Sequence, residues 1–151
     1  MFVCQANICR SPLAAGILRC LLRERGLEAQ NWQVGSAGTW AREGMGYDPT
    51  VIEILRRRGG VVQGVARCIN SGMVVKFNLI LVMERGQKEA LRFEFPQHGS
   101  KIYLLSEMAG LICSIQDPSG GLLEDYERTA SEIEQYLNKG WKRMFDIASN
   151  C

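Results

Sequence analysis

A cysteine and an arginine close to the N-terminus have the types and spacing that phosphoryl transfer needs. Cys4 and Arg10 lie at the two ends of one short run, with five residues between them. A thiolate is a strong nucleophile, and a guanidinium can hold two phosphate oxygens at once, which an ammonium group cannot match. This spacing arises often by chance, because a buried cysteine followed by a surface arginine has the same pattern. The surrounding elements must therefore decide between a phosphate-binding loop and a coincidence.

The run stands between a predicted strand and a predicted helix. Residues 1–3 are apolar and predict a short strand, and residues 11–25 have helical periodicity with a proline at the first helical position. A helix N-terminus presents unpaired N–H groups and a partial positive charge, so a loop folded over it forms an anion site. The same field favours the thiolate form of Cys4. Asn7 tolerates the positive φ of a tight loop, and the Ser11 hydroxyl can donate a hydrogen bond to the sulfur.

Strands and helices alternate along the rest of the chain. Strands are predicted at residues 1–3, 32–34, 79–83 and 101–105, helices at 11–25, 49–58, 85–93 and from 122 to the end, and loops at 35–48 and 106–121. This order predicts one α/β domain, residues 1–151, with a four-stranded parallel sheet flanked by helices on both faces. Such doubly wound sheets bind ligands beyond the carboxyl ends of their strands, which is where the Cys4 loop follows the first strand.

Composition excludes several classes of function. The net charge of +2 is too small to predict a nucleic-acid or membrane surface, and no apolar run is long enough to span a bilayer. No signal peptide is recognisable, so we expect a cytoplasmic protein whose six cysteines are mostly thiols. The cysteines have no C-x-x-C spacing, and the single histidine, His98, has no partner at metal-ligand spacing. We therefore expect neither a metal nor a cofactor.

The run from Val3 to Pro12 resembles the phosphate-binding signature of the low-molecular-weight protein tyrosine phosphatases, V-C-x-G-N-I-C-R-S-P. It matches at nine of ten positions, counting the variable one, and Ala6 replaces the usual glycine. The resemblance continues in order along the chain, at Gly35-Ser36-Ala37-Gly38-Thr39, Ala66-Arg67, the apolar run ending in Met83, and Asp117-Pro118. The fold that it implies, known as phosphotyrosine phosphatase I-like, has the four-stranded parallel sheet predicted above.

The resemblance also implies a role for each residue of the site. Cys4 would be the nucleophile, Arg10 the phosphate clamp, and Ser11 a donor to the sulfur, while Gln5, Ala6, Asn7, Ile8 and Cys9 would form the loop around the phosphate. Asp117 would be the general acid and then the base, a role that its place after the fourth strand also permits. An aspartate before a proline is alternatively a simple turn residue. Asn7 and Ser36 would form a hydrogen-bond network that supports the loop.

Three departures from the family pattern lie around the predicted site. Ala6 adds a methyl group to the loop, Gly64 stands where the family has a histidine, and Ser119 begins a Ser-Gly-Gly run where the family has aromatic residues beside the substrate. We therefore expect a more open and more mobile acid loop. Trp40 is a candidate wall beside the substrate or else a half-buried loop residue, and Tyr47 and Ser119 are weaker candidates for the same wall.

These observations predict an enzyme that hydrolyses protein phosphotyrosine and small aryl phosphates through a phosphocysteine. Its partners would be tyrosine-phosphorylated proteins, a bacterial tyrosine kinase among them by analogy, with inorganic phosphate as product and inhibitor and with no nucleic acid or membrane. Cys9 lies five residues after Cys4 and, as in the family, would trap an oxidised Cys4 as a disulfide.

Two alternatives to this enzyme remain. An arsenate reductase of the same fold needs two further cysteines after the third strand, and residues 83–95 contain none. A phosphatase-like module that binds phosphorylated ligands without turnover is kept open by Ala6, Gly64 and the missing aromatic residues. The intact Cys4, Arg10, Ser11 and Asp117 argue against such a module.

Overall fold

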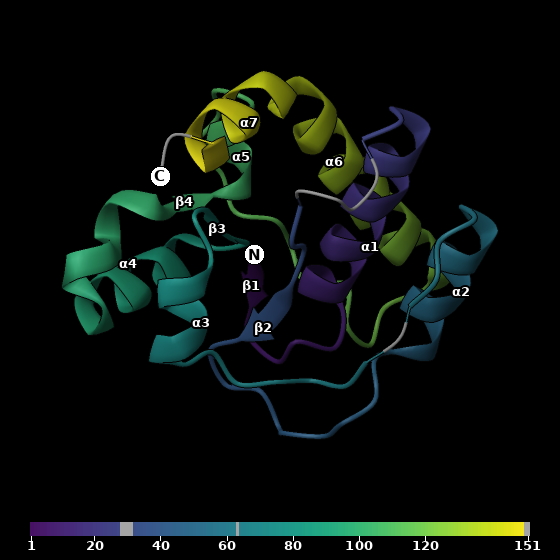
Figure 1. The fold of residues 1–151 in the computed structure, drawn as a ribbon. Coiled ribbons are helices and arrows are strands. Elements are labelled where there is room, and N and C mark those ends of the chain that lie inside the picture. Colours follow the sequence, from purple (N-terminus) through teal and green to yellow (C-terminus); the bar gives the residue numbers. More distant parts are fainter. Residues whose placement is uncertain (28–31, 63, 150–151) are drawn as a thin grey trace.

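A computed structural model describes residues 1–27, 32–62 and 64–149 of the chain. Four parallel strands, each of three residues, form one sheet in the order β2-β1-β3-β4 (Figure 1). The strands are β1 (Phe2–Cys4), β2 (Ser36–Gly38), β3 (Ile80–Val82) and β4 (Ile102–Leu104). In the register of the two central strands, Phe2 lies beside Leu81 and Val3 beside Val82. The predicted four-stranded parallel sheet is therefore confirmed.

Helices cover both faces of this sheet, as expected for parallel strands. The helical elements are α1 (Arg10–Glu24), α2 (Pro49–Arg57), α3 (Ser71–Lys76), α4 (Arg85–Glu94), the 3₁₀ turn η1 (Pro96–Lys101), α5 (Leu105–Met108), α6 (Leu123–Lys139) and α7 (Trp141–Ser149). In Figure 1, α1, α2 and α6 lie on one side of the strands and α3 and α4 on the other. Each side has its own apolar core. Because side chains alternate along β1, Phe2 and Cys4 belong to the α1 core and Val3 to the α4 core.

The predicted strand at residues 32–34 is wrong, and β2 lies instead at Ser36–Gly38, inside the segment predicted as a loop. Small residues such as these have low strand propensity, which hid the strand. The small residues are needed because β2 runs close to the loop after β1. A Cβ on Gly38 would lie 2.5 Å from the carbonyl oxygen of Gln5. Close backbone approach therefore explains why this strand looks like a loop in the sequence.

The C-terminal half also differs from the predicted elements. The long helix predicted from residue 122 is divided into α6 and α7 at Gly140, and its last two residues lie outside the described part of the chain. Any side chain at Gly140 would collide with Met108, so the glycine permits α5 to pack closely here. The short helices α3 and α5 were not predicted, because four to six residues are too few to show helical periodicity.

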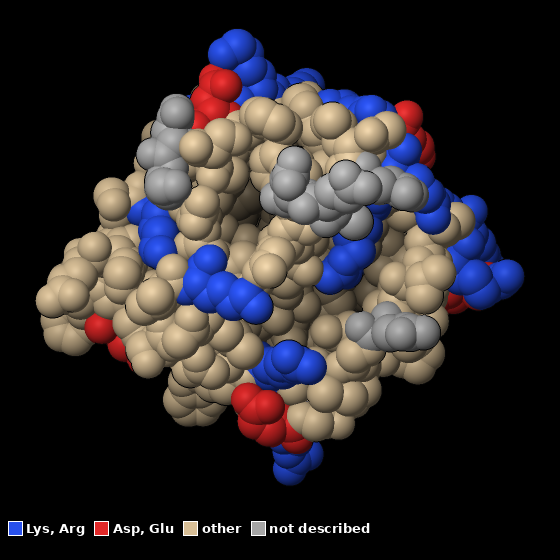
Figure 2. All heavy atoms as spheres, viewed as in Figure 1, with Lys and Arg blue, Asp and Glu red and all other residues tan. Residues whose placement is uncertain are grey.

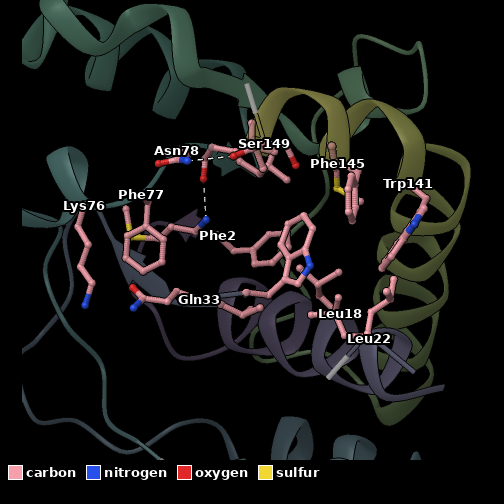
Figure 3. Close-up of a pocket in the computed structure, with 18 of the residues that line it drawn as sticks. Phe2, Leu18, Leu22, Gln33, Lys76, Phe77, Asn78, Trp141, Phe145 and Ser149 are labelled. Carbon is pink, nitrogen blue, oxygen red and sulfur yellow. Dashed lines mark hydrogen bonds between the residues drawn. The ribbon is translucent and has the colours of Figure 1, made fainter. Parts of the chain in front are cut away.

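A cavity of about 930 Å³ opens at the amino ends of the strands (Figure 3). Aromatic side chains from several elements line it, including Phe2, Trp32, Phe77, Trp141 and Phe145. The rings of Trp32 and Phe145 lie 4.9 Å apart between their centroids. No Asp or Glu is among the described residues that line this cavity. On the molecular face shown in Figure 2, basic side chains are more prominent than acidic ones. No described helix combines the length and apolar character needed to cross a membrane.

Candidate active site

The predicted loop lies at the opposite, carboxyl edge of the sheet, between β1 and α1. Cys4 is the last residue of β1, and α1 begins at Arg10, so residues 5–9 form a tight connection. Asn7 has a φ of 55°, and no other described residue except glycine has a positive φ. Its left-handed conformation turns the chain back over the start of α1. The residues after β2 hold the loop, since the backbone N–H of Trp40 donates to the carbonyl of Gln5 at 2.8 Å.

The sulfur of Cys4 lies within a buried hydrogen-bond network. It is 3.0 Å from the Ser11 hydroxyl oxygen, which accepts a hydrogen bond from the Asn7 amide at 2.9 Å. The same hydroxyl donates to the carbonyl oxygen of Ala37 at 3.1 Å. A hydroxyl has one proton, so Cys4 donates to Ser11 while it is a thiol. Once Cys4 is a thiolate, the Ser11 proton has to turn from Ala37 to the sulfur, and Asn7 keeps the oxygen in place for this exchange.

The predicted support of the loop by Ser36 takes a different form in the structure. The side-chain amide oxygen of Asn7 accepts a hydrogen bond from the backbone N–H of Arg67 at 2.9 Å. The Ser36 hydroxyl lies 3.5 Å from the hydroxyl of Tyr47. A Cβ on Gly64 would be 3.0 Å from that Tyr47 hydroxyl, so Tyr47 occupies the space beside the glycine. The loop is thus supported directly by a backbone group, and Ser36 and Tyr47 form a separate contact next to it.

The side chain of Arg10 is almost fully buried, with 2% of its surface exposed. Its Nη1 donates to Glu84 at 2.5 Å and to the carbonyl oxygen of Ile115 at 2.9 Å. Its Nη2 donates to Asp117 at 2.6 Å. The Nε atom is buried and has no hydrogen-bond partner. An unpaired buried donor is costly, so the free Nε marks a position where an anion would be stabilised.

Asp117 reaches the site on the segment that follows β4 and α5. The backbone N–H of Ile115 donates to the carbonyl of Met83 at 2.8 Å, which anchors this segment to the end of β3. The second carboxylate oxygen of Asp117 accepts a hydrogen bond from the backbone N–H of Ser119 at 3.1 Å. The structure therefore brings Asp117 and Arg10 together, in keeping with the place of Asp117 after the fourth strand. The mobility of the Ser-Gly-Gly run after it stays a prediction.

Glu84 is a site residue that the sequence analysis missed. It lies two residues after β3, where it is the N-cap of α4. Its carboxylate pairs with Arg10 and accepts a hydrogen bond from the side-chain amide nitrogen of Gln87 at 3.0 Å. The side-chain amide oxygen of Gln87 accepts hydrogen bonds from the backbone N–H groups of Met83 and Glu84, at 3.0 and 3.2 Å. An acidic residue just after a buried strand at the ligand-binding edge was the available signal.

Cys9 faces a carboxylate rather than open solvent. Its sulfur donates to Asp48 at 3.6 Å, and the Tyr126 hydroxyl donates to the same oxygen at 2.8 Å. Burial first, and then the charges of Asp48 and Asp117, raise the pKa of the Cys9 thiol to about 12, although a hydrogen bond with Ser119 acts in the opposite direction. Cys9 is therefore a protonated thiol at neutral pH and a poor nucleophile. Its disulfide with Cys4 stays a prediction.

Asp48 also fixes the start of α2 beside the loop. Burial alone would raise the pKa of its carboxyl group, but hydrogen bonds from Tyr126, Thr50 and Cys9 outweigh burial and hold that pKa below its usual value. One of its oxygens accepts from the backbone N–H of Thr50 at 2.8 Å, which caps the helix. A single carboxylate thus connects α2, α6 and the residue that precedes Arg10.

The candidate wall residues differ in exposure. Trp40 is 84% exposed, so it is not a half-buried loop residue, and its backbone bonds directly to the phosphate loop. Tyr47 is half-buried and points toward Ser36, and Ser119 interacts with Cys9. Trp40 is therefore the wall candidate with a free apolar surface. Among the described residues, no group of His, Cys, Asp or Glu is arranged to hold a metal ion.

Comparisons with known proteins extend over nearly the whole chain. Residues 1–145 match the model of the family described as low molecular weight phosphotyrosine protein phosphatase. A protein-arginine-phosphatase from Bacillus subtilis is 28% identical over 145 residues, 95% of each chain. The low molecular weight protein-tyrosine-phosphatase PtpB from Staphylococcus haemolyticus is 30% identical over 138 residues, which cover 91% of this chain and 94% of the relative.

Solved structures give the same likeness in three dimensions. A low molecular weight protein tyrosine phosphatase from T. tengcongensis superposes with a TM-score of 0.87 at 30% identity, covering 94% of this chain and 96% of that one. The YwlE arginine phosphatase, as a cysteine-to-serine mutant with a phosphorylated active-site serine, superposes with a TM-score of 0.87 at 26% identity, covering 96% and 93%. The predicted fold and family resemblance are thereby confirmed.

Proposed function

The chain belongs to the low molecular weight phosphotyrosine protein phosphatase family, and from this premise we propose that Cys4 hydrolyses phosphotyrosine in proteins through a phosphocysteine. One observation supports the assignment most strongly. Arg10 is fully buried at the mouth of the loop, shares Nη2 with Asp117, and keeps Nε without a partner. A buried guanidinium with a free N–H donor, next to a carboxylate that a phosphate can displace, is suited to bind an anion. Cys4 lies at the other end of the same loop.

The first half of the proposed reaction transfers the phosphoryl group to sulfur. The substrate phosphate is held by loop N–H groups and Arg10, and the Cys4 thiolate attacks phosphorus. A sulfur–phosphorus bond forms while the bond to the tyrosine oxygen breaks. Asp117, displaced from Arg10 by the phosphate and protonated, gives its proton to the leaving oxygen. Ser11 donates to the sulfur when it carries negative charge.

The second half releases phosphate. Asp117, now a carboxylate, takes a proton from a water molecule that attacks the phosphocysteine, and the sulfur–phosphorus bond breaks. Ser11 stabilises Cys4 again as the leaving thiolate. Inorganic phosphate is the product, and because it fits the same loop it would also inhibit. We place the reaction in the cytoplasm, since it requires Cys4 as a free thiol.

The test of this function is turnover of an aryl phosphate in the presence of a metal chelator. We expect the wild-type protein to turn it over, Cys4→Ser to be inactive, and Asp117→Asn to be strongly impaired. A wild-type protein that binds phosphate without turnover would instead be the non-catalytic binding module. Turnover with unchanged activity in Asp117→Asn would remove Asp117 from the mechanism.

A second candidate substrate is phosphoarginine, because the Bacillus subtilis relative is named a protein-arginine-phosphatase. We favour phosphotyrosine because the exposed Trp40 gives an aryl ring a flat apolar surface beside Gln5. Paired peptides that differ only in phosphotyrosine or phosphoarginine decide the question. We expect kcat/KM to be larger for phosphotyrosine by about 10-fold or more, the discrimination that one stacking contact can supply. The reverse ratio would assign the chain to phosphoarginine.

The physiological substrates that we propose are tyrosine-phosphorylated proteins, including a bacterial tyrosine kinase. A kinase of this type would be dephosphorylated on its own tyrosines by the reaction described above. Incubation of such a phosphorylated kinase with wild-type protein should remove its phosphotyrosine, and Cys4→Ser should leave it in place.

A further inference from the structure

The hydrogen bonds of Arg10 show which part of its guanidinium is free for a phosphate. A guanidinium has five N–H donors. In Arg10, both donors of Nη1 are used, by Glu84 and by the carbonyl oxygen of Ile115, and one donor of Nη2 is used by Asp117. The Nε–H and the other N–H of Nη2 remain, so a phosphate can bind bidentately only along the edge formed by Nε and Nη2.

We propose that Glu84, held by Gln87, is the positioning residue that keeps this edge of Arg10 turned toward the phosphate. The inference rests on the proposed function, because it concerns the same phosphate site. In this account Glu84 keeps Nη1 throughout the reaction, whereas Asp117 gives up Nη2 when phosphate binds. The two carboxylates that share one arginine therefore have different tasks.

The anchoring of the two carboxylates explains this division. Glu84 is the N-cap of α4, two residues after β3, and the buried Gln87 both donates to its carboxylate and accepts from its backbone N–H. Apart from its bond with Arg10, the Asp117 carboxylate is held among the described residues by one hydrogen bond, from the N–H of Ser119, and it lies shortly before a Ser-Gly-Gly run. The better-anchored carboxylate stays with the arginine, and the less anchored one is free to move to the leaving oxygen.

Charge also supports the exchange. Without a ligand, the single positive charge of Arg10 faces two carboxylates. A phosphate dianion that joined both would meet strong repulsion, so its binding favours the departure of Asp117 from Arg10 toward the leaving oxygen. Phosphate binding at Nε and Nη2 thereby couples substrate arrival to preparation of the acid, provided that Glu84 holds Nη1.

The test compares Glu84→Ala with Glu84→Gln. Alanine removes the hydrogen bond to Nη1, and we expect kcat to fall about 30-fold and KM to rise about 10-fold, because a misplaced guanidinium weakens the transition state more than the bound phosphate. Glutamine keeps an acceptor for both Nη1 and Gln87, so it should recover most of the lost kcat. Glu89→Ala, an exposed position on the same helix, is the matched control and should behave as wild type.

A second readout needs no turnover. Calorimetric titration with inorganic phosphate should show affinity about 10-fold weaker in Glu84→Ala, one lost charge-assisted contact, and recovered in Glu84→Gln. Wild-type kcat and phosphate affinity in Glu84→Ala would overturn the proposal, as would equal losses in both variants. If wild type lacks turnover but Glu84→Ala weakens phosphate binding, the proposed function fails and this inference stands. If wild type is active and the variants match it, the inference alone fails.

Discussion

The two edges of the sheet differ in almost every property that determines function. At the amino edge, aromatic side chains surround a cavity of about 930 Å³ without a described acidic residue in its lining. At the carboxyl edge there is a narrow loop in which Cys4, Asn7, Arg10 and Ser11 are all buried and nearly every polar atom has a partner. The cavity at the amino edge offers mainly apolar contacts, whereas the smaller loop at the carboxyl edge holds the groups that can react. Convergence of buried polar groups, with one donor left free, locates the site better than volume does.

Strand β1 connects the two edges. Phe2 lines the cavity and Cys4 ends in the loop, although both side chains belong to the core below α1. The polar groups of the site lie at the carboxyl edge, whereas the amino edge is packed with apolar side chains. We therefore expect substitutions at the carboxyl edge to lower activity with little loss of stability, and substitutions at the amino edge to lower stability with little loss of activity. The following predictions test that separation, beginning with the largest expected effect.

Replacing Cys4 by serine should abolish turnover. A serine hydroxyl in place of a thiolate is a far weaker nucleophile, and we expect kcat to fall by about 10⁴-fold or more, as for other essential nucleophiles. The fold should be retained because the two side chains have similar size. Steady-state assays with an aryl phosphate, together with thermal unfolding, measure both properties. Residual turnover within 100-fold of wild type would show that the nucleophile lies elsewhere.

Replacing Asp117 by asparagine should lower kcat by about 10²- to 10⁴-fold, the usual contribution of a general acid or base. The loss should be larger for substrates whose leaving group is more basic, because these need the proton most. A series of aryl phosphates with different leaving-group pKa values measures this dependence. An equal loss for all leaving groups would mean that Asp117 acts only through its pairing with Arg10.

Replacing Met144 by alanine tests the amino edge. Met144 is 5% exposed and lines the cavity, so its truncation should lower the free energy of unfolding by about 2–5 kcal/mol. Chemical denaturation measures this change, while kcat of the folded protein should stay as in wild type. A marked fall in kcat at a temperature well below the unfolding transition would contradict the separation of the two edges.

Burial of the Cys9 thiol, together with its contact with Asp48, gives a pH dependence of stability at the carboxyl edge. The pKa of Cys9 rises from 9.0 to about 12 on folding. Between these values the unfolded chain loses the thiol proton and the folded chain keeps it, so stability should fall as pH rises through this window. Urea midpoints measured at increasing pH should fall more steeply in wild type than in Cys9→Ala. Equal slopes in the two proteins would show that Cys9 has no such role.

The smallest expected effect is at Trp40. Its replacement by alanine should raise KM for phosphotyrosine peptides about 3- to 10-fold through loss of aromatic contact, while inorganic phosphate should inhibit as before. Inorganic phosphate has no ring to pack against the indole, so it serves as the internal control. A change in phosphate inhibition would show that Trp40 shapes the loop through its backbone contact with Gln5.

The two edges also differ in how well the sequence predicts them. The Cys4 loop is predictable because its strand, positive-φ residue, proline and helix are contiguous. Strand β2 was missed because close packing against Gln5 requires small residues at Ser36–Gly38, and small residues resemble a loop. Glu84 was missed because its pairing with Arg10 spans 74 positions and depends on strand order. The contact between Ser36 and Tyr47 depends on how Tyr47 packs beside Gly64, and a local sequence pattern cannot predict such packing.

The central claim is that Cys4 carries the phosphoryl group during turnover. Mass spectrometry of protein quenched while it hydrolyses an aryl phosphate tests this claim most directly, and the Asp117→Asn variant, whose hydrolysis step is slowed, should accumulate more of the intermediate. We predict a phosphoryl group on the peptide that contains Cys4, attached to that sulfur. Turnover with no phosphoryl group on Cys4 in either protein, or with the group on Cys9, would contradict the account.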